Sequence, residues 1–599
     1  MEILCYTREP KEDIIYANRL AYSVHLAWKD ENGKFIPFHH NEGLLYAKAV
    51  SREDGTLTAK SLRKPWIFAC GDGTYGVVAI RTEAEGEADM ESEGCILIFK
   101  SEDFVHYQEI GLLRLQKSGF IEEVQCVFDK HTGKYLISWT GTDGIWKQVS
   151  GNPFVETELY MDEEKCAKQE AESNVVQNSS DWDTIEGICP GNQIEVPDKL
   201  GDYLIKKLML PKCVEICAVL EDRKISSDIL VPEEKLQSVK AKAIYSDGTE
   251  AIRKIDWEKK ENGEVNGRVH QEHFPFPFTE NRADPCCMYW KGKYYFIATN
   301  DADDNHTLYM RCADTLEGII DAEEKLILDS ETYPGIGGLL WAPEFHEIAG
   351  KMYIFHAATE GEFFREESRV MKLRDGGDPM CREDWSAPML VVKKDGTPLC
   401  DAGNVISLDM TTFEYEGNIY AMWSQRQFLP VDQGAWLYLA QIDEKEPWKL
   451  VSDPICIVKP EYGWENNHTF VVEGPYALRY HDQLYITYSG AAVDATYAVG
   501  LLKPIMGSDI LKPENWQRSN YPLLSSRSKE GEFGPGHNSY VTDENGLVWN
   551  FYHARPGVDG PRSSAARRVH FDIDGELVLD LLEEYDLPEA MRQITVKIR

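Results

Sequence analysis

Five ionisable side chains stand at similar distances before a hairpin turn that recurs along the second half of the chain. Each lies 6 to 9 residues before the Gly or Asp of its turn. If the five turns belong to equivalent structural units, these side chains converge on one place. Carboxyl groups crowded into a partly desolvated site repel and shift one another's pKa values, which favours a functional site over a structural one. The residues are Asp284, Glu344, Asp409, Glu473 and His537.

Glycoside hydrolysis is a reaction that is catalysed by a pair of carboxyl groups. One protonated acid assists the leaving oxygen, while a carboxylate activates water or attacks the anomeric carbon. A third acid can orient the proton donor and keep its pKa high. A single buried acid is more often a core residue with satisfied hydrogen bonds, but four acids at one repeated offset are not explained in that way.

The elements that must position these side chains are repeated antiparallel hairpins. A turn followed by alternating aromatic and aliphatic residues returns in steps of 58, 67, 65 and 64 residues. A period of about 60 residues suits a four-stranded propeller blade. Five such units between about 270 and 599 predict a five-bladed β-propeller whose innermost strands carry the acids toward the central axis. The turns are GKYYFIAT at Gly292, GKMYIFHAA at Gly350, GNIYAMWS at Gly417, HDQLYITYS around Asp482 and GLVWNFYHA at Gly546.

The chain upstream divides into two further regions, so an all-β protein with three domains is expected. Residues 1–190 contain weaker copies of the hairpin at Gly73 and Gly133, and Lys64 stands where the first acid would be. We interpret this region as a degenerate, non-catalytic relative of the propeller that serves either substrate access or packing and oligomerisation. Residues 191–270 carry short alternating strands that predict a small immunoglobulin-like β-sandwich. The propeller is assigned to residues 271–599.

The composition narrows the choice of partner. The 599 residues include 63 basic and 101 acidic side chains, a formal charge of −38 that is spread along the chain. This excess argues against nucleic acid and against an anionic membrane surface, and leaves a neutral oligosaccharide as the expected partner. The first 20 residues lack the basic start and apolar run of a signal peptide, so a cytoplasmic location is expected. Oligomeric state cannot be inferred from the composition.

The phrases around the five ionisable residues resemble glycoside hydrolase family 43, a family of five-bladed propeller enzymes. The matching phrases are RADPCCMYWKGKYYFIAT, LLWAPEFHEIAGKMYIFHAA, ISLDMTTFEYEGNIYAMWSQ, VVEGPYALRYHDQLYITYS and GPGHNSYVTDENGLVWNFYHARP. The resemblance implies that Asp284 is the general base, Asp409 the pKa modulator and Glu473 the general acid. It implies no cofactor for the chemistry itself, and a structural calcium ion held through water near His537.

The same resemblance suggests further substrate-binding residues. Trp341 and Trp464 are candidates for an aromatic wall around the sugar, although each could equally fill a junction between blades. Glu344 of the WAPE phrase is expected in a supporting or substrate-facing role. Either Arg562 or Arg567 is expected in the pocket, and the alignment does not decide between them.

The activity expected from the resemblance is that of an exo-acting α-L-arabinofuranosidase on arabinan or arabinoxylan oligosaccharides. Inversion of configuration would require an acid and a base about 6.5–9.5 Å apart. A β-xylosidase of the same family and a sugar-binding propeller without catalysis are the alternatives. A sugar phosphorylase would need a basic phosphate pocket, whereas the residues expected at the axis are acidic.

Overall fold

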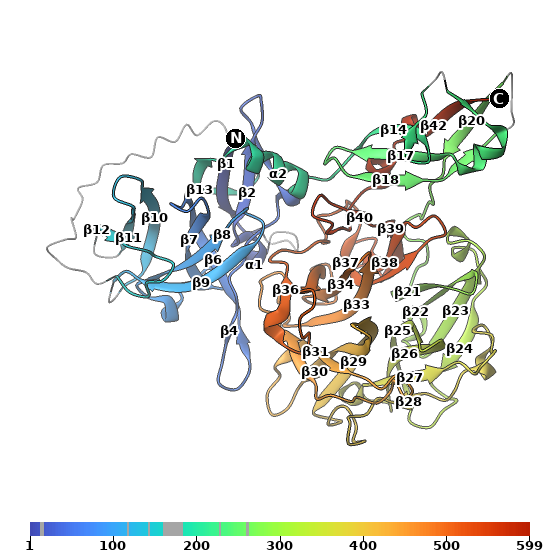
Figure 1. Ribbon diagram of the computed structural model, residues 1–599. Coiled ribbons are helices and arrows are strands. Elements are labelled where there is room, and N and C mark those ends of the chain that lie inside the picture. Colours follow the sequence, from blue (N-terminus) through green and yellow to red (C-terminus); the bar gives the residue numbers. More distant parts are fainter. Residues whose placement is uncertain are drawn as a thin grey trace.

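The computed structural model describes residues 1–11, 17–116, 119–141, 144–159, 182, 184–226, 229–258 and 263–599. The protein is built almost wholly from β-strands, which form three groups of sheets (Figure 1). The described residues contain three α-helices, α1 (Asn18–Ala21), α2 (Asp198–Leu208) and α3 (Glu583–Asp586). None of them has the length and apolar character needed to span a bilayer.

The C-terminal half is a five-bladed propeller, which confirms the predicted fold. Four blades are four-stranded and the fifth is three-stranded. The ring closes where β21 packs against β37, and Thr279, just before β21, bridges to Ser564 in the fifth blade. The blades are β21 (Arg282–Trp290), β22 (Lys293–Asn300), β23 (Thr307–Ala313) and β24 (Lys325–Asp329); β25 (Gly338–Ile348), β26 (Lys351–Thr359), β27 (Glu367–Lys372) and β28 (Met389–Leu390); β29 (Val405–Tyr415), β30 (Asn418–Gln427), β31 (Gly434–Gln441) and β32 (Ile455–Val458); β33 (Val472–Tyr480), β34 (Gln483–Gly490), β35 (Ala498–Pro504) and β36 (Trp516–Arg518); and β37 (Phe533–Thr542), β38 (Val548–Arg555) and β39 (Ser563–Arg568).

The innermost strand of every blade carries the same two-residue bulge. The first bulged residue has a left-handed backbone, with φ of 49° at Asp284, 45° at Ala342, 55° at Asp409, 55° at Gly474 and 53° at His537. Such a backbone costs a residue with a side chain about 1–3 kcal/mol, and strain of this kind collects at functional sites. A bulge aims the side chain away from the ordinary strand alternation. The five bulges therefore mark the propeller axis.

The bulges correct the prediction that all five ionisable residues are equivalent. Asp284, Asp409 and His537 do share one position, but Glu473 precedes the bulged Gly474 by one residue and Glu344 follows Ala342 by two. The bulged residue lies 8 residues before Gly292, Gly350, Gly417 and Asp482 and 9 before Gly546, so the offsets of 6 for Glu344 and 9 for Glu473 depart from the bulge position. At Gly474 an added Cβ would lie 3.1 Å from the His537 ring, which is closer than an ordinary contact.

The described residues of the N-terminal region form three sheets and one short hairpin. Lys64 sits in a bulge of the same kind as those of the propeller, with φ of 51°. The region extends beyond the expected boundary at 190, because β13 supplies an outermost strand of the first sheet. Its interpretation as a degenerate propeller stays a prediction. The strands are β1 (Glu2–Arg8), β2 (His25–Lys29), β3 (Phe35–Pro37) and β13 (Ile188–Glu195); β6 (Lys60–Ala69), β7 (Tyr75–Glu83), β8 (Cys95–Ser101) and β9 (Tyr107–Arg114); β10 (Ile121–Asp129), β11 (Lys134–Gly141) and β12 (Gly144–Ser150); and the hairpin β4 (Val50–Ser51) and β5 (Leu57–Thr58).

The N-terminal region packs against the third and fourth blades through a continuous apolar core (Figure 1). The core joins side chains of β1, β2 and β7 to buried residues of β29, β30, β33 and β34. At its edge, Lys207 of α2 is buried and lies 2.6 Å from Asp572 and 2.7 Å from Glu576 of the propeller. The large shared core fixes this region beside the propeller.

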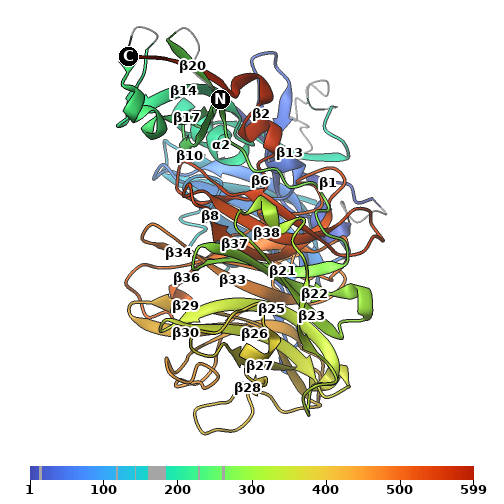
Figure 2. The same cartoon turned by 90° about the vertical axis from the view of Figure 1, so that its right-hand side faces the viewer.

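The small sandwich lies next to the fifth blade in both views (Figures 1 and 2). Its second sheet contains β42, the last strand of the chain, which pairs with β20. The predicted boundary of 271–599 for the propeller is therefore wrong at its C-terminal end. The alternating burial along β42 completes the sandwich core beside β20. The strands are β14 (Cys213–Leu220), β15 (Arg223–Lys224), β17 (Lys240–Tyr245) and β18 (Glu250–Arg253), and β16 (Leu230–Val231), β19 (Ile255–Trp257), β20 (Glu264–Val269) and β42 (Gln593–Ile598); a separate two-stranded sheet, β40 (His570–Phe571) and β41 (Leu577–Val578), follows the fifth blade.

Candidate active site

Three carboxyl groups meet near the beginnings of three innermost strands. Asp284 lies on β21, Asp409 on β29 and Glu473 on β33. Asp284 and Asp409 are buried, and the charges of Asp284 and Glu473 act on the pKa of Asp409, as the charge of Asp284 does on that of Glu473. The backbone N–H of Gly474 donates a hydrogen bond of 3.0 Å to Oδ2 of Asp409, which ties the third blade to the fourth.

Asp284 is surrounded by polar side chains. The Thr299 hydroxyl donates to Oδ2 at 2.6 Å. Around Oδ1 lie a guanidinium nitrogen of Arg562 at 3.3 Å, Nδ1 of His537 at 3.2 Å and Nδ1 of His553 at 3.1 Å. Burial alone would raise the pKa of Asp284, but Arg562 and the two imidazoles outweigh it and hold the pKa well below its usual range. Asp284 is therefore ionised near neutral pH.

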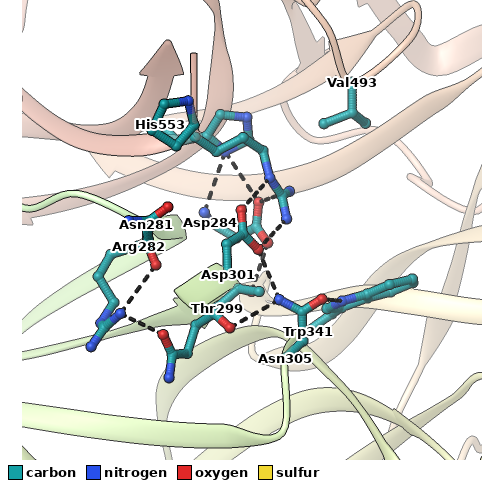
Figure 3. A network of polar contacts seen from close by, with 12 residues as sticks. Asn281, Arg282, Asp284, Thr299, Asp301, Asn305, Trp341, Val493 and His553 are labelled. Carbon is teal, nitrogen blue, oxygen red and sulfur yellow. Dashed lines mark hydrogen bonds and ion pairs between the residues drawn. The ribbon is translucent and has the colours of Figure 1, made fainter. Parts of the chain in front are cut away.

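A chain of polar contacts runs from Asp284 to the rim of the site (Figure 3). Arg562 also binds Asp301, at 2.8 and 2.9 Å. The Asn305 side chain donates to Asp301 at 2.8 Å and accepts a hydrogen bond of 2.8 Å from the indole of Trp341. Trp341 is half-buried and stands at the outer end of this chain. Its orientation is therefore coupled to the residues that hold Asp284.

Glu473 has the opposite environment. Burial and the nearby charge of Asp284 raise its pKa to about 7, although a hydrogen bond of 2.8 Å from the Tyr497 hydroxyl lowers it in part. Burial and the repulsion of Glu473 and Asp284 also raise the pKa of Asp409 well above its usual range. The pair Asp409 and Glu473 therefore retains a proton at a pH where Asp284 has lost its own.

This separation of pKa values assigns chemical roles. Asp284 can accept a proton near neutral pH, and Glu473 can donate one. A base and an acid on opposite blades of one axis are the arrangement that hydrolyses glycosidic bonds. Among the described residues no group of three or more His, Cys, Asp or Glu side chains is placed to hold a metal ion.

The family model described as glycosyl hydrolases family 43 matches residues 274–577. The chain belongs to glycoside hydrolase family 43. The match begins just before the propeller and ends at β41, so it includes all three carboxyl groups.

Relatives of this family 43 chain match about half of its length. It is 34% identical over 308 residues to α-L-arabinofuranosidase B of Pyricularia oryzae, covering 49% of this chain and 60% of the relative. It is 32% identical over 300 residues to an extracellular exo-α-(1→5)-L-arabinofuranosidase of Streptomyces chartreusis, covering 49% of this chain and 86% of that one. A crystal structure of an α-L-arabinofuranosidase from Lactobacillus brevis aligns with a TM-score of 0.45 and 30% identity, covering 50% of this chain and 94% of the other.

Several predicted substrate-binding residues of the family 43 chain lie elsewhere in the structure. Trp464 is 1% exposed and belongs to the core shared with the N-terminal region, so it forms no wall for a sugar. Arg567 is buried and binds Glu532 at 2.8 Å, whereas Arg562 reaches Asp284. Glu344 follows its bulge by two residues and is paired at 2.8 Å with His346, in a buried supporting position. Of these candidates, Arg562 contacts Asp284, and Trp341 is linked to it through Asn305 and Asp301.

The sequence reasoning missed four residues that contact the central carboxyl groups or their partners. Thr299 on β22 was recoverable, because it pairs with Ala283 across the first hairpin and so stands beside Asp284. Asp301, His553 and Tyr497 approach from a loop, from β38 and from the residue before β35. No local pattern marks these three, because only the closed ring brings them to the axis.

Proposed function

We propose that this chain is an exo-acting α-L-arabinofuranosidase that releases terminal arabinose from arabinan or arabinoxylan oligosaccharides with inversion of configuration. One observation carries the proposal: Arg562 keeps Asp284 ionised while Glu473 retains a pKa of about 7 on the facing blade. The choice of sugar is supported by the names of the relatives, two of which are called α-L-arabinofuranosidase or exo-α-(1→5)-L-arabinofuranosidase.

In the proposed mechanism a water molecule stands between Asp284 and the anomeric carbon of the terminal sugar. Asp284 takes a proton from that water, whose oxygen forms the new bond to the anomeric carbon. The glycosidic bond breaks, and Glu473 gives its proton to the departing oxygen. Asp409 is the proposed pKa modulator and accepts a hydrogen bond from the Gly474 N–H, which holds the Glu473 backbone in place. Burial and the charge of Asp284 favour the protonated form of Glu473.

We propose that His537 holds a calcium ion through a water molecule. Nε2 of His537 is buried and has no hydrogen-bond partner among the described residues, while burial lowers the pKa of this imidazole to about 4. The neutral ring can donate from Nδ1 to Asp284 and accept from a water at Nε2. An ion there would supply positive charge that favours ionised carboxylates. Metal analysis after dialysis against calcium should find about one ion per chain, and less in His537→Ala; no retained calcium would contradict this proposal.

The proposed activity is tested with two aryl glycosides. The wild-type chain should release p-nitrophenol from the α-L-arabinofuranoside and much less from the β-D-xylopyranoside, and Asp284→Asn should release neither. A reversed preference would identify a β-xylosidase. No release from either, with binding of arabino-oligosaccharides retained, would identify a sugar-binding propeller without catalysis.

A further inference from the structure

An aromatic cluster continues outward from Trp341 along the rim of the site. Phe363 lies on the short turn after β26, with its ring centre 6.0 Å from that of Trp341. Phe364 and Phe428 complete the group, at 5.5 and 5.6 Å from Phe363. We call Phe363, Phe364 and Phe428 the rim cluster. It extends from the second blade to the third and begins where the polar chain from Asp284 ends.

The rim cluster faces solvent instead of filling a core. Phe363 is 39% exposed and Phe364 is 49% exposed, although both are large and apolar. Exposed apolar patches next to an active site commonly mark a binding surface. The loops are also held in place, because the N–H of Gly403 donates to the Phe364 carbonyl at 2.8 Å and the N–H of Phe428 donates to the Asn404 carbonyl at 2.8 Å. The surface is therefore preorganised.

At its far end the rim cluster meets a polar pocket formed together with the N-terminal region. The Arg426 guanidinium lies 4.8 Å from the centre of the Phe428 ring and forms an ion pair of 2.6 Å with Asp432. Beside it a cavity of about 200 Å³ is lined by both regions. The hairpin of β4 and β5 reaches it, and the Asp54 carbonyl accepts a hydrogen bond of 2.9 Å from Gln433. The lining residues used here are Thr56, Leu57, Arg426, Gln433 and His468.

We propose that the rim cluster and this pocket bind the second and third sugars of a linear arabino-oligosaccharide, on the leaving-group side of the scissile bond. This inference rests on the proposed function. If the terminal sugar occupies the axial site beside Asp284, the rest of the chain must leave across the rim. Aromatic rings suit the apolar edges of sugar rings, and the pocket offers guanidinium, amide, hydroxyl and imidazole groups to their hydroxyls. An arabino-oligosaccharide is uncharged. The surface proposed to bind it pairs the charge of Arg426 with that of Asp432.

The location also gives the N-terminal region a role in substrate access. Its β4–β5 hairpin borders the outer end of the path, while its core fixes that hairpin against the third and fourth blades. A substrate long enough to reach the pocket would touch both regions. A disaccharide or an aryl glycoside would not.

The test compares substrates of different length. The wild-type value of kcat/KM should rise from arabinobiose to arabinotetraose. Phe364→Ala and Phe363→Ala should lower kcat/KM for the tetraose by roughly three- to tenfold, as the loss of an aromatic contact implies. The loss should be smaller for the p-nitrophenyl arabinofuranoside, whose aryl group reaches no further than the position of the second sugar. Tyr289→Ala is the matched control, because Tyr289 is 46% exposed on β21 at the end away from Asp284. Equal losses on both substrates, or no loss on either, would overturn the proposal.

A binding measurement separates failure of this inference from failure of the proposed function. If the wild-type chain hydrolyses none of these substrates, the proposed function is wrong. The affinity of arabinotetraose for wild type and for Phe364→Ala, measured by calorimetry, then decides the role of the rim cluster. A threefold or greater loss in the variant supports it, while equal affinity, or no binding to either protein, overturns it.

Discussion

The guanidinium group of Arg562 lies 3.3 Å from the carboxylate of Asp284, in a site where both side chains are largely buried. The other edge of the guanidinium is held by Asp301, at 2.8 Å. Arg562 comes from the start of the last blade strand and Asp284 from the first blade, so their contact lies at the closure of the ring. We regard it as the interaction that makes Asp284 a base.

Replacing Arg562 should move the acidic limb of the pH profile. Without the guanidinium, burial raises the pKa of Asp284, so in Arg562→Met the limb should shift upward by about 1–3 pH units. The measurement is kcat/KM against pH with the aryl arabinofuranoside. Arg567→Met is the control, since Arg567 binds Glu532 and not Asp284. An acidic limb that stays in place in Arg562→Met would show that this arginine does not set the charge of the base.

Replacing Tyr497 should move the alkaline limb in the direction of higher pH. The Tyr497 hydroxyl donates to Glu473 and so stabilises its ionised form. In Tyr497→Phe the pKa of Glu473 should rise above about 7, so Glu473 should stay protonated up to a higher pH. The measurement is again kcat/KM against pH with the aryl arabinofuranoside. A downward shift would mean that the tyrosine holds the protonated acid instead.

The two carboxyl groups that we propose as base and acid should respond differently to the leaving group. Glu473→Gln removes the proton donor, so kcat should fall by about 10²–10⁴ on an oligosaccharide and far less on an aryl glycoside, whose phenolate departs without protonation. Asp284→Asn removes the base and should slow both substrates alike. Steady-state rates on the two substrates give the comparison. If the loss of rate in Asp284→Asn depended on the leaving group instead, Asp284 would be the proton donor and Glu473 the base.

A buried ion-pair network joins the sandwich to the propeller. Asp586 lies 2.5 Å from Arg253 of the sandwich and 2.5 Å from Arg568 of β39, and receives the Tyr245 hydroxyl at 2.6 Å. Breaking a buried pair by removing one partner costs about 3–5 kcal/mol. Asp586→Asn should lower the free energy of unfolding by that amount, measured by urea denaturation at pH 7.

The same network predicts a pH dependence of stability. Burial would raise the pKa of Asp586, but Arg253 and Arg568 outweigh it and hold the pKa far below its usual range. The stabilisation is therefore complete above the unfolded pKa of about 3.9 and is lost as the pH falls below it. The difference in the free energy of unfolding between wild type and Asp586→Asn should become smaller as the pH is lowered. A constant difference down to pH 3 would contradict the role of the charge.

The hairpins, the five blades and the three central acids could be predicted from the sequence because turn residues and alternating apolar residues act locally. Glu344 and Glu473 lie 6 and 9 residues before their turns, against 8 for Asp284 and Asp409, but which residue of each strand is bulged could not be read from the alternation. Trp341 and Trp464 illustrate a second limit. Both are tryptophans in plausible positions, but Trp464 packs near Tyr488 of the fourth blade and belongs to the core shared with the N-terminal region. The pairing of β20 with β42 spans more than 300 residues, which no local pattern encodes.

The central claim is that Asp284 directs water to the anomeric carbon while Glu473 protonates the leaving oxygen. Proton NMR of the first sugar released from an α-L-arabinofuranoside, recorded before mutarotation, tests it directly. Single displacement by water predicts that β-L-arabinose appears first and the α anomer accumulates only later. If α-L-arabinose appears first, the reaction retains configuration through a covalent intermediate, and the role assigned to Asp284 is wrong.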